Sequence, residues 1–191
     1  MTVAFPQIRY VFLDRDGVII RKLPEGEYLS DRDEMQLLPG AESAVASLNR
    51  AGRRVIVVSN QRGIALGRVT REGVEAIHAR LQDRLALSHG HIDAFYYCPH
   101  DKGECDCRKP GTGLLLQAFR DFPEASKETS LLIGDSLSDI EAARNFGIPS
   151  IFIEGDPSTQ KDGAEKAASL ATRVSLSLLT AVESYLLPNP H

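Results

Sequence analysis

The stretch VFLDRDG, residues 11–17, joins a short apolar run to two carboxylates and a glycine. A continuously apolar run of this length is typical of a strand buried on both faces, as in a parallel sheet. Gly17 allows the backbone to turn sharply after the strand. Because a carboxylate at the end of a buried strand is costly to desolvate unless it is paired, Asp14 and Asp16 indicate a divalent-cation site. A plain polar turn is the alternative.

Further short apolar runs follow this stretch, and amphipathic segments separate them. We expect additional strands at residues 55–58, 95–97, 131–133 and 151–153. Helical spacing of apolar residues predicts helices over residues 74–85 and from residue 137 to Gly147, and the tail over residues 164–187 is expected to be helical too. This alternation predicts an α/β fold, a three-layer Rossmann-like sandwich with a parallel sheet and helices on both faces.

The length of 191 residues and the balance of 42% hydrophobic and 25% charged residues fit one ordinary domain spanning residues 1–191. The segment between Gly17 and Gly40 is too short for an independent domain, so no separate cap domain is expected. A formal net charge of −4 gives no field for nucleic acid. No apolar run could span a membrane, and the first residues lack a secretory h-region. We therefore expect a cytoplasmic monomer with no nucleic-acid or membrane partner.

Polar residues directly follow the predicted strands, at the strand ends where open α/β sheets bind ligands. Gly134 and Asp135 end one strand, and Asp139 lies on the helix that follows. Capping of that helix by Asp135 or Ser136 is the ordinary alternative. However, Asp14 would lie at the same edge, and three adjacent carboxylates without a cation would repel one another. Hard oxygen ligands suit Mg²⁺.

Two further polar segments are candidates for binding phosphate. A hydroxyl, an amide and backbone N–H groups at the end of the second strand can bind phosphate oxygens; this segment contains Ser59, Asn60, Gln61 and Arg62. Arg108 and Lys109 precede Pro110, which fits the first turn of the next helix. Lys109 could hold a phosphate and a nucleophile together, and the Arg108 fork could bind a second anionic group. A polar turn and a solvated basic pair are the alternatives.

The three cysteines all lie within ten residues, in the pattern Cys98-x-His100 and Cys105-x-Cys107. Three thiolates and one imidazole form a closed tetrahedral set, which predicts a structural zinc site and a zinc-stabilised loop. Reduced spectator cysteines are the alternative. The other histidines show no partner spacing and are interpreted as surface or ordinary helix residues: His78, His89, His91 and His191.

Taken together, the ordered segments resemble the haloacid dehalogenase superfamily of phosphotransferases. The resemblance implies that Asp14 is the nucleophile that forms an aspartyl-phosphate, and that Asp16 protonates the leaving oxygen and then activates water. It also implies that Ser59 and Lys109 bind the phosphoryl group. Mg²⁺ would be held by Asp14, the backbone carbonyl of Asp16, and Asp135, with Asp139 supporting Lys109 or a metal-bound water.

The cysteine loop followed by Arg108-Lys109-Pro110 is similar to the zinc-containing branch of this superfamily, whose members include phosphatases of heptose bisphosphate and of histidinol phosphate. The segment from Ser59 to Gly67 is similar to an Asn-Gln-x-Gly-Ile-Ala-x-Gly stretch of the heptose enzymes, and this resemblance implies a heptose 1,7-bisphosphate as the substrate. Two features depart from the heptose enzymes: Ile20 stands where they usually have Asn, and the four-residue spacer in the cysteine loop resembles that of histidinol phosphatases. Histidinol phosphate is therefore the alternative substrate. Basic groups at Arg62, Arg108 and the pair Arg21-Lys22 favour a small metabolite with a second anionic group.

Two other classes of protein share some of these features. A phospho-acceptor signalling domain also places aspartate and lysine at strand ends, but an acid–base group at the spacing of Asp16 promotes hydrolysis rather than a lasting phosphoryl mark. A zinc-stabilised binding module would have no turnover. The sequence therefore predicts a Mg²⁺-dependent phosphatase that hydrolyses a phosphomonoester of a small phosphorylated metabolite.

Overall fold

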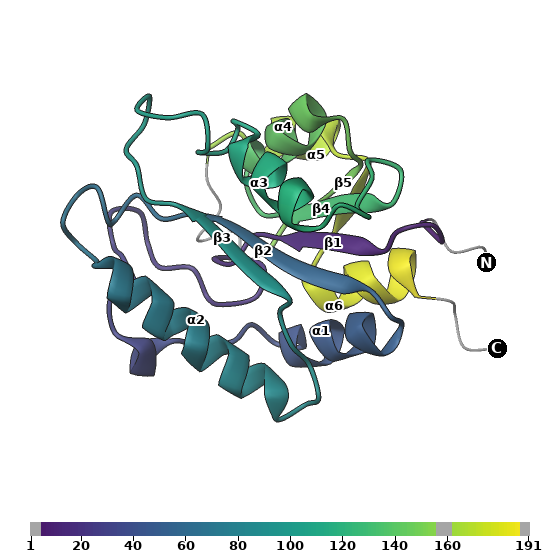
Figure 1. Ribbon diagram of the computed structural model, residues 1–191, viewed down its shortest axis with the longest axis horizontal. Helices are drawn as coiled ribbons and strands as arrows, with labels where there is room; N and C mark the ends of the chain where they lie inside the picture. Colours follow the sequence, from purple (N-terminus) through teal and green to yellow (C-terminus); the bar gives the residue numbers. More distant parts are fainter. Residues whose placement is uncertain (1–4, 156–161, 188–191) are drawn as a thin grey trace.

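A six-stranded parallel sheet forms the centre of the molecule (Figure 1), in a computed structural model that describes residues 5–155 and 162–187. The strand order is β3-β2-β1-β4-β5-β6, and every neighbouring pair is parallel. The strands are β1 (Tyr10–Leu13), β2 (Arg54–Asn60), β3 (Ala94–Cys98), β4 (Ser130–Gly134), β5 (Ser150–Ile153) and β6 (Arg173–Ser175). All five predicted strands are present, and β6 is an additional one.

Helices cover both faces of the sheet, which confirms the three-layer sandwich (Figure 1). One face is covered by α1 (Ala41–Arg50), α2 (Arg71–Ala86), α6 (Leu178–Ala181) and the π-helical turn η3 (Val182–Leu186). The other face is covered by α3 (Gly113–Asp121), α4 (Leu137–Phe146) and α5 (Ala164–Leu170). The helices predicted around residues 74–85 and 137–147 correspond to α2 and α4.

Alternate residues of each strand point into the two halves of the core. In β1, Val11 and Leu13 pack with the α1, α2 and α6 layer, whereas Phe12 packs with α3 and α4. All three side chains are fully buried. The apolar runs in this sequence are continuous because each strand is buried on both faces of the sheet.

The tail after residue 164 is not one helix, which corrects the sequence-based expectation. Helix α5 ends at Leu170, and Ala171 already has an extended backbone. Residues Arg173–Ser175 then pair with β5, and the amide of Glu154 donates to the carbonyl of Ser175 at 2.9 Å. The exposed edge of β5 offers unpaired backbone groups, and pairing with them outweighs the helical preference of the segment.

The segment between β1 and α1 remains short and loop-like. It contains a one-turn 3₁₀ helix at Arg32–Glu34 and isolated bridges that join Ile20 to Asp16 and to Leu37.

The position of Pro110 differs from the prediction that it lies in the first turn of a helix, because α3 begins only at Gly113 and Pro110 lies in the loop before it. Within the described ranges, no second domain interrupts the sandwich. His91 is exposed, whereas His191 lies outside the described residues.

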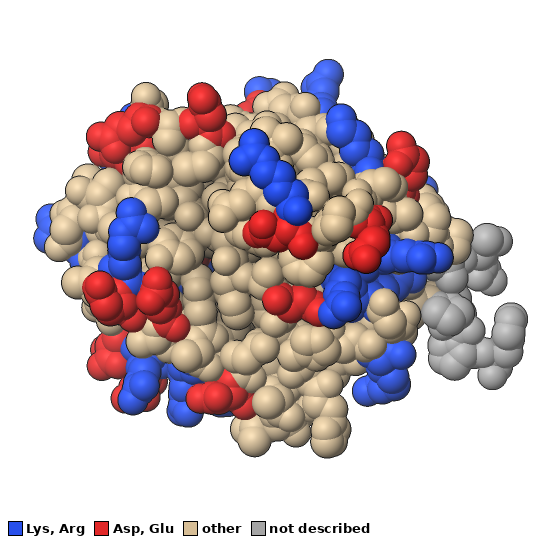
Figure 2. All heavy atoms as spheres, viewed as in Figure 1, with Lys and Arg blue, Asp and Glu red and all other residues tan. Residues whose placement is uncertain are grey.

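Charged side chains are mixed in sign on the face shown in Figure 2, where Lys and Arg lie among Asp and Glu without a broad patch of one sign. This distribution agrees with the small formal net charge of −4. Among the described helices, none is both long enough and apolar enough to cross a lipid bilayer.

Candidate active site

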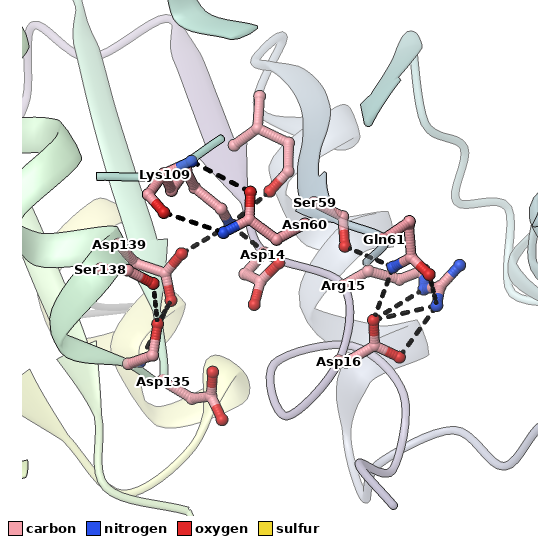
Figure 3. Close-up of polar contacts among 12 residues, drawn as sticks. Asp14, Arg15, Asp16, Ser59, Asn60, Gln61, Lys109, Asp135, Ser138 and Asp139 are labelled. Carbon is pink, nitrogen blue, oxygen red and sulfur yellow. Dashed lines mark hydrogen bonds and ion pairs between the residues drawn. The ribbon is translucent and has the colours of Figure 1, made fainter. Parts of the chain in front are cut away.

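Two carboxylates meet where the strand order changes direction, between β1 and β4. Asp14 follows β1 and Asp135 follows β4, and these strands pair with Leu13 opposite Ile133. The amide of Asp14 donates to the carbonyl of Ile133 at 2.9 Å. Carboxylate oxygens of Asp14, Asp135 and Asp139 all lie within 4.8 Å of one another (Figure 3). Asp14 and Asp135, predicted to lie at the same edge of the sheet, are therefore brought together, and Asp139 joins them, whereas the carboxylate of Asp16 is not part of this cluster.

The chemistry of this cluster fits a divalent cation. The Asp135 Oδ1 atom is buried and has no hydrogen-bond partner. Burial, together with the charges of Asp14 and Asp139, raises the pKa of Asp135 to about 6. Burial also raises the pKa of Asp139. A buried cluster of carboxylates that resists ionisation is what a hard cation such as Mg²⁺ relieves, with Asp14 and Asp135 as the available ligands.

Lys109 contacts two of the three carboxylates in the cluster, those of Asp14 and Asp139. Its Nζ atom donates to Asp14 Oδ1 at 2.9 Å and to the carbonyl of Val58 at 2.6 Å, and lies 2.5 Å from Asp139 Oδ1. Burial alone would lower the pKa of Lys109, but the carboxylates of Asp139 and Asp14 outweigh it and raise the pKa above its usual value. Lys109 is therefore a fixed positive charge beside the candidate nucleophile.

Asn60 fixes the backbone at Lys109. Its Nδ2 atom donates to the carbonyl of Lys109, and its Oδ1 atom accepts from the amide of Lys109, each at 3.0 Å. Asn60 ends β2, and Lys109 belongs to the cysteine loop. This pair of hydrogen bonds therefore attaches the loop to the sheet. Sequence reasoning assigned Asn60 to the substrate, whereas here its amide is occupied by Lys109.

The carboxylate of Asp16 points away from Lys109 (Figure 3). Arg15 binds both of its oxygens, at 3.0 Å and 2.9 Å from Nη2, and Gln61 Nε2 donates to Oδ2 at 3.0 Å. The same Gln61 nitrogen lies 2.8 Å from Ser59 Oγ, which accepts from it. Gln61 therefore links two predicted catalytic residues rather than pointing freely into solvent.

Two glycines leave room for the carboxylates. Gly17 has a φ of +91°, and a Cβ there would lie 2.2 Å from Asp135 Oδ2. At Gly134 a Cβ would lie 2.2 Å from the Cβ of Asp139. Neither position can carry a side chain without displacing a carboxylate of the cluster.

Asp139 has a structural and a site role at once. Its Oδ2 atom accepts from the amide of Ser136 at 3.1 Å and from the hydroxyl of Ser136 at 2.6 Å, which completes a capping box at the start of α4. Its Oδ1 atom faces Lys109. Ser136, one of the two residues predicted to cap the helix, is the N-cap, and Asp139 both completes this cap and contacts Lys109.

A wide cleft of about 1230 Å³ opens beside the cluster. It is lined by loops that include Asp16, Tyr28, Arg62, Lys102 and Arg108. The Nη1 atom of Arg108 is buried and has no hydrogen-bond partner. Arg62 donates from Nε to Asp101 Oδ1 at 2.5 Å and thereby lowers the pKa of Asp101. Lys22, expected to face the substrate, instead contacts the carboxylate of Asp135.

The three cysteines and His100 converge in the loop after β3. Their sulfur and Nδ1 atoms lie 3.2–3.6 Å from their neighbours in the cluster. Two thiolates around a tetrahedral zinc ion would lie about 3.8 Å apart, so the donor set and its spacing fit zinc. Burial raises the pKa of Cys98 and of Cys107. For Cys105, burial is outweighed by hydrogen bonds from Cys107 and the Arg108 amide, which lower the pKa to about 7.

Two residues that sequence reasoning did not assign to the site also belong to its surroundings. Arg15 is only 2% exposed and holds Asp16, and an arginine between two aspartates was the available signal. His78 is 6% exposed and contacts Arg15, although its spacing gave no sign of a partner.

Comparison with known proteins shows the family to which this chain is related. Residues 106–181 match the family described as HAD-hydrolase-like. A D-glycero-beta-D-manno-heptose-1,7-bisphosphate 7-phosphatase of Rhodopseudomonas palustris is 36% identical over 82% of this chain and 89% of its own length. A D-glycero-alpha-D-manno-heptose-1,7-bisphosphate 7-phosphatase of Mycobacterium bovis is 41% identical over 71% of each chain.

A solved structure gives the same result. The D,D-heptose 1,7-bisphosphate phosphatase of B. bronchiseptica, crystallised with magnesium and phosphate, is 29% identical to this chain and superposes with a TM-score of 0.79. The alignment covers 92% of this chain and 97% of that one.

Proposed function

The chain belongs to the haloacid dehalogenase-like phosphatases, and from that premise we propose that it hydrolyses the 7-phosphate of D-glycero-D-manno-heptose 1,7-bisphosphate. The relatives from Rhodopseudomonas palustris and Mycobacterium bovis carry the proposal, because both bear the name of this activity. They favour the heptose bisphosphate over histidinol phosphate. Their names differ in the anomer, so the proposal covers both anomers of the sugar.

A second anionic group on the substrate agrees with the cleft. Arg108 lines it with a buried Nη1 atom that has no protein hydrogen-bond partner, and Lys102 lines it from the same loop. A guanidinium fork suits the two oxygens of a phosphate. We assign the binding of the distal phosphate to Arg108, with Arg62 beside it. The cleft is large enough for a seven-carbon sugar that carries two phosphates.

The first half of the reaction uses Asp14 and Asp16. The carboxylate of Asp14 attacks phosphorus, a P–O bond to Asp14 forms, and the bond from phosphorus to the sugar oxygen breaks. Asp16 donates a proton to that oxygen, so the sugar leaves as an alcohol. Lys109 and the hydroxyl of Ser59 hold the phosphoryl oxygens while negative charge is redistributed among them.

The second half reverses the role of Asp16. As a carboxylate it now accepts a proton from water, the water oxygen bonds to phosphorus, and the bond to Asp14 breaks, which releases inorganic phosphate. A bound Mg²⁺ would neutralise charge on the phosphoryl group, and Asp14 and Asp135, with the backbone carbonyl of Asp16, would hold it. Asp139 keeps Lys109 in place throughout.

The cysteine loop has a supporting role in this proposal. Zinc held by Cys98, His100, Cys105 and Cys107 would rigidify the loop that carries Arg108 and Lys109. Preordering these two cations lowers the entropy cost of arranging them around a substrate. We propose that the sandwich acts as one catalytic domain, whose cleft is shaped by this loop and by residues 22–29.

A side-by-side assay tests the proposed substrate. Phosphate release from heptose 1,7-bisphosphate and from histidinol phosphate would be measured with Mg²⁺ and with a chelator. We expect Mg²⁺-dependent release, with kcat/KM at least about a hundredfold higher for the heptose, equivalent to about 3 kcal/mol of differential transition-state binding. A preference for histidinol phosphate would refute the proposal.

A further inference from the structure

Arg15 is almost wholly buried, and its guanidinium contacts three other side chains, those of Asp16, Gln61 and His78. Its Nη2 atom donates to both oxygens of Asp16 and, at 3.1 Å, to Gln61 Oε1. Its Nη1 atom lies 3.3 Å from His78 Nε2. Because arginine can only donate, Nε2 must be the accepting nitrogen of the ring and the proton must reside on Nδ1.

His78 is itself fixed by packing. It projects from α2, and its ring stacks on Phe95 of β3 with centroids 4.4 Å apart and planes 13° from parallel. The ring of Tyr97 meets it edge-on at 5.7 Å. Burial, with the charge of Arg15 as a second cause, lowers the pKa of His78 to about 3. The imidazole is therefore a neutral acceptor at any physiological pH.

From these contacts we propose that Arg15 and His78 are positioning residues that set the orientation of the Asp16 carboxylate and hence its ability to protonate the leaving oxygen. The connection runs from α2, which takes no direct part in the cluster, through His78 and Arg15 to Asp16. Asp16 is partly exposed and accepts only from side chains in the described contacts, so its orientation depends on Arg15 and Gln61. The inference rests on the proposed role of Asp16 as the general acid.

The leaving group distinguishes positioning of an acid from general support of the fold. An alkyl phosphate such as the sugar needs a proton on its leaving oxygen, whereas p-nitrophenolate leaves without one. Misplacing Asp16 should therefore slow the sugar far more than p-nitrophenyl phosphate. The parameter kcat/KM is the appropriate one, because it reports the steps up to departure of the leaving group and excludes the later hydrolysis of the phosphoenzyme.

The variants are His78→Leu, His78→Gln and Phe95→Leu. Leucine removes the acceptor at similar volume, glutamine retains an acceptor at a comparable reach, and Phe95→Leu removes only the stacking ring. For His78→Leu we expect kcat/KM to fall about 10- to 100-fold with the alkyl phosphate and less than about threefold with p-nitrophenyl phosphate. Glutamine should restore most of the alkyl activity, and Phe95→Leu should affect both substrates alike.

An equal loss with both substrates, or no loss with either, would overturn the proposal, because a structural role predicts no dependence on the leaving group. If His78→Leu does not fold, His78→Asn replaces it, since the shorter amide cannot reach Arg15. If the wild-type chain does not hydrolyse the heptose bisphosphate, the proposed substrate fails on its own. The comparison is then run with any alkyl phosphate that the enzyme does hydrolyse, so the two failures stay distinguishable.

Discussion

Lys109 Nζ lies 2.5 Å from Asp139 Oδ1, and both side chains are almost wholly buried. The same ammonium group lies 2.9 Å from Asp14 Oδ1. A single buried cation thus joins the carboxylate that would attack phosphorus to the carboxylate that caps α4. The start of α4 and the end of β1 are therefore coupled through one charge, and removing either carboxylate leaves the buried Lys109 with only one negative partner.

Asp139→Asn tests this coupling through stability. Because the substitution leaves Lys109 with only one carboxylate partner, we expect the free energy of unfolding to fall by about 3 kcal/mol. Chemical denaturation measures it. Glu141→Gln is the matched control, since Glu141 lies on the same helix and forms an exposed ion pair with Lys166, which should contribute less than about 1 kcal/mol. In a Lys109→Met background the cost of Asp139→Asn should shrink; an undiminished cost would contradict the coupling.

Arg108→Ala tests the assignment of the distal phosphate. The buried Nη1 atom of Arg108 has no hydrogen-bond partner in the protein. Removing the guanidinium should therefore weaken the binding only of a substrate whose second phosphate accepts a hydrogen bond from it. We expect KM for the bisphosphate to rise at least about tenfold, while KM for p-nitrophenyl phosphate changes little. Arg120→Ala, on the exposed face of α3, is the control. If Arg108→Ala raised KM equally for both substrates, Arg108 would not be the group that binds the distal phosphate.

Cys107→Ser tests the zinc site. Metal analysis should find about one zinc per wild-type chain and none in the variant, and the melting temperature of the variant should fall by several degrees. Asp106→Asn, between two of the proposed ligands in the sequence, should retain zinc. A zinc-free wild-type protein with the same melting temperature as the variant would show that the cysteines are spectators.

His78 should make the protein sensitive to acid. Its pKa is lowered from 6.5 to about 3 in the folded state, so its contribution to stability is complete above pH 6.5 and is lost as the pH falls toward the folded value. Arg15 is the charged group in contact with the ring, and Phe95 and Tyr97 form its other walls. We expect about 3 kcal/mol to be lost between pH 6.5 and about pH 4 through this group.

Unfolding curves of the wild type and of His78→Gln across this pH range isolate the effect, because other titrating groups are common to both proteins. The variant should lose less stability on acidification. Parallel curves for the two proteins would mean that His78 is protonated in the folded state or accessible to water.

The parts of the site that follow a strand could be predicted, because the ends of parallel strands meet at one edge whatever the details of packing. Asp14 and Asp135 are of this kind, and the spacing of Cys98 to Cys107 is equally local. The partners of Arg15 and His78 could not be predicted, since a contact between residues 63 positions apart depends on how α2 lies on the sheet. The strand β6 was missed for the same reason, because it exists only by pairing with β5.

Phosphorus NMR of heptose 1,7-bisphosphate, incubated with Mg²⁺ and either the wild-type chain or Asp14→Asn, tests the role of Asp14 as the nucleophile. We expect the wild type to convert the 7-phosphate signal to inorganic phosphate and to leave the 1-phosphate intact. Asp14→Asn should be at least about a thousandfold slower while remaining folded. Release of phosphate by Asp14→Asn at a rate near that of the wild type would contradict the claim that Asp14 is the nucleophile.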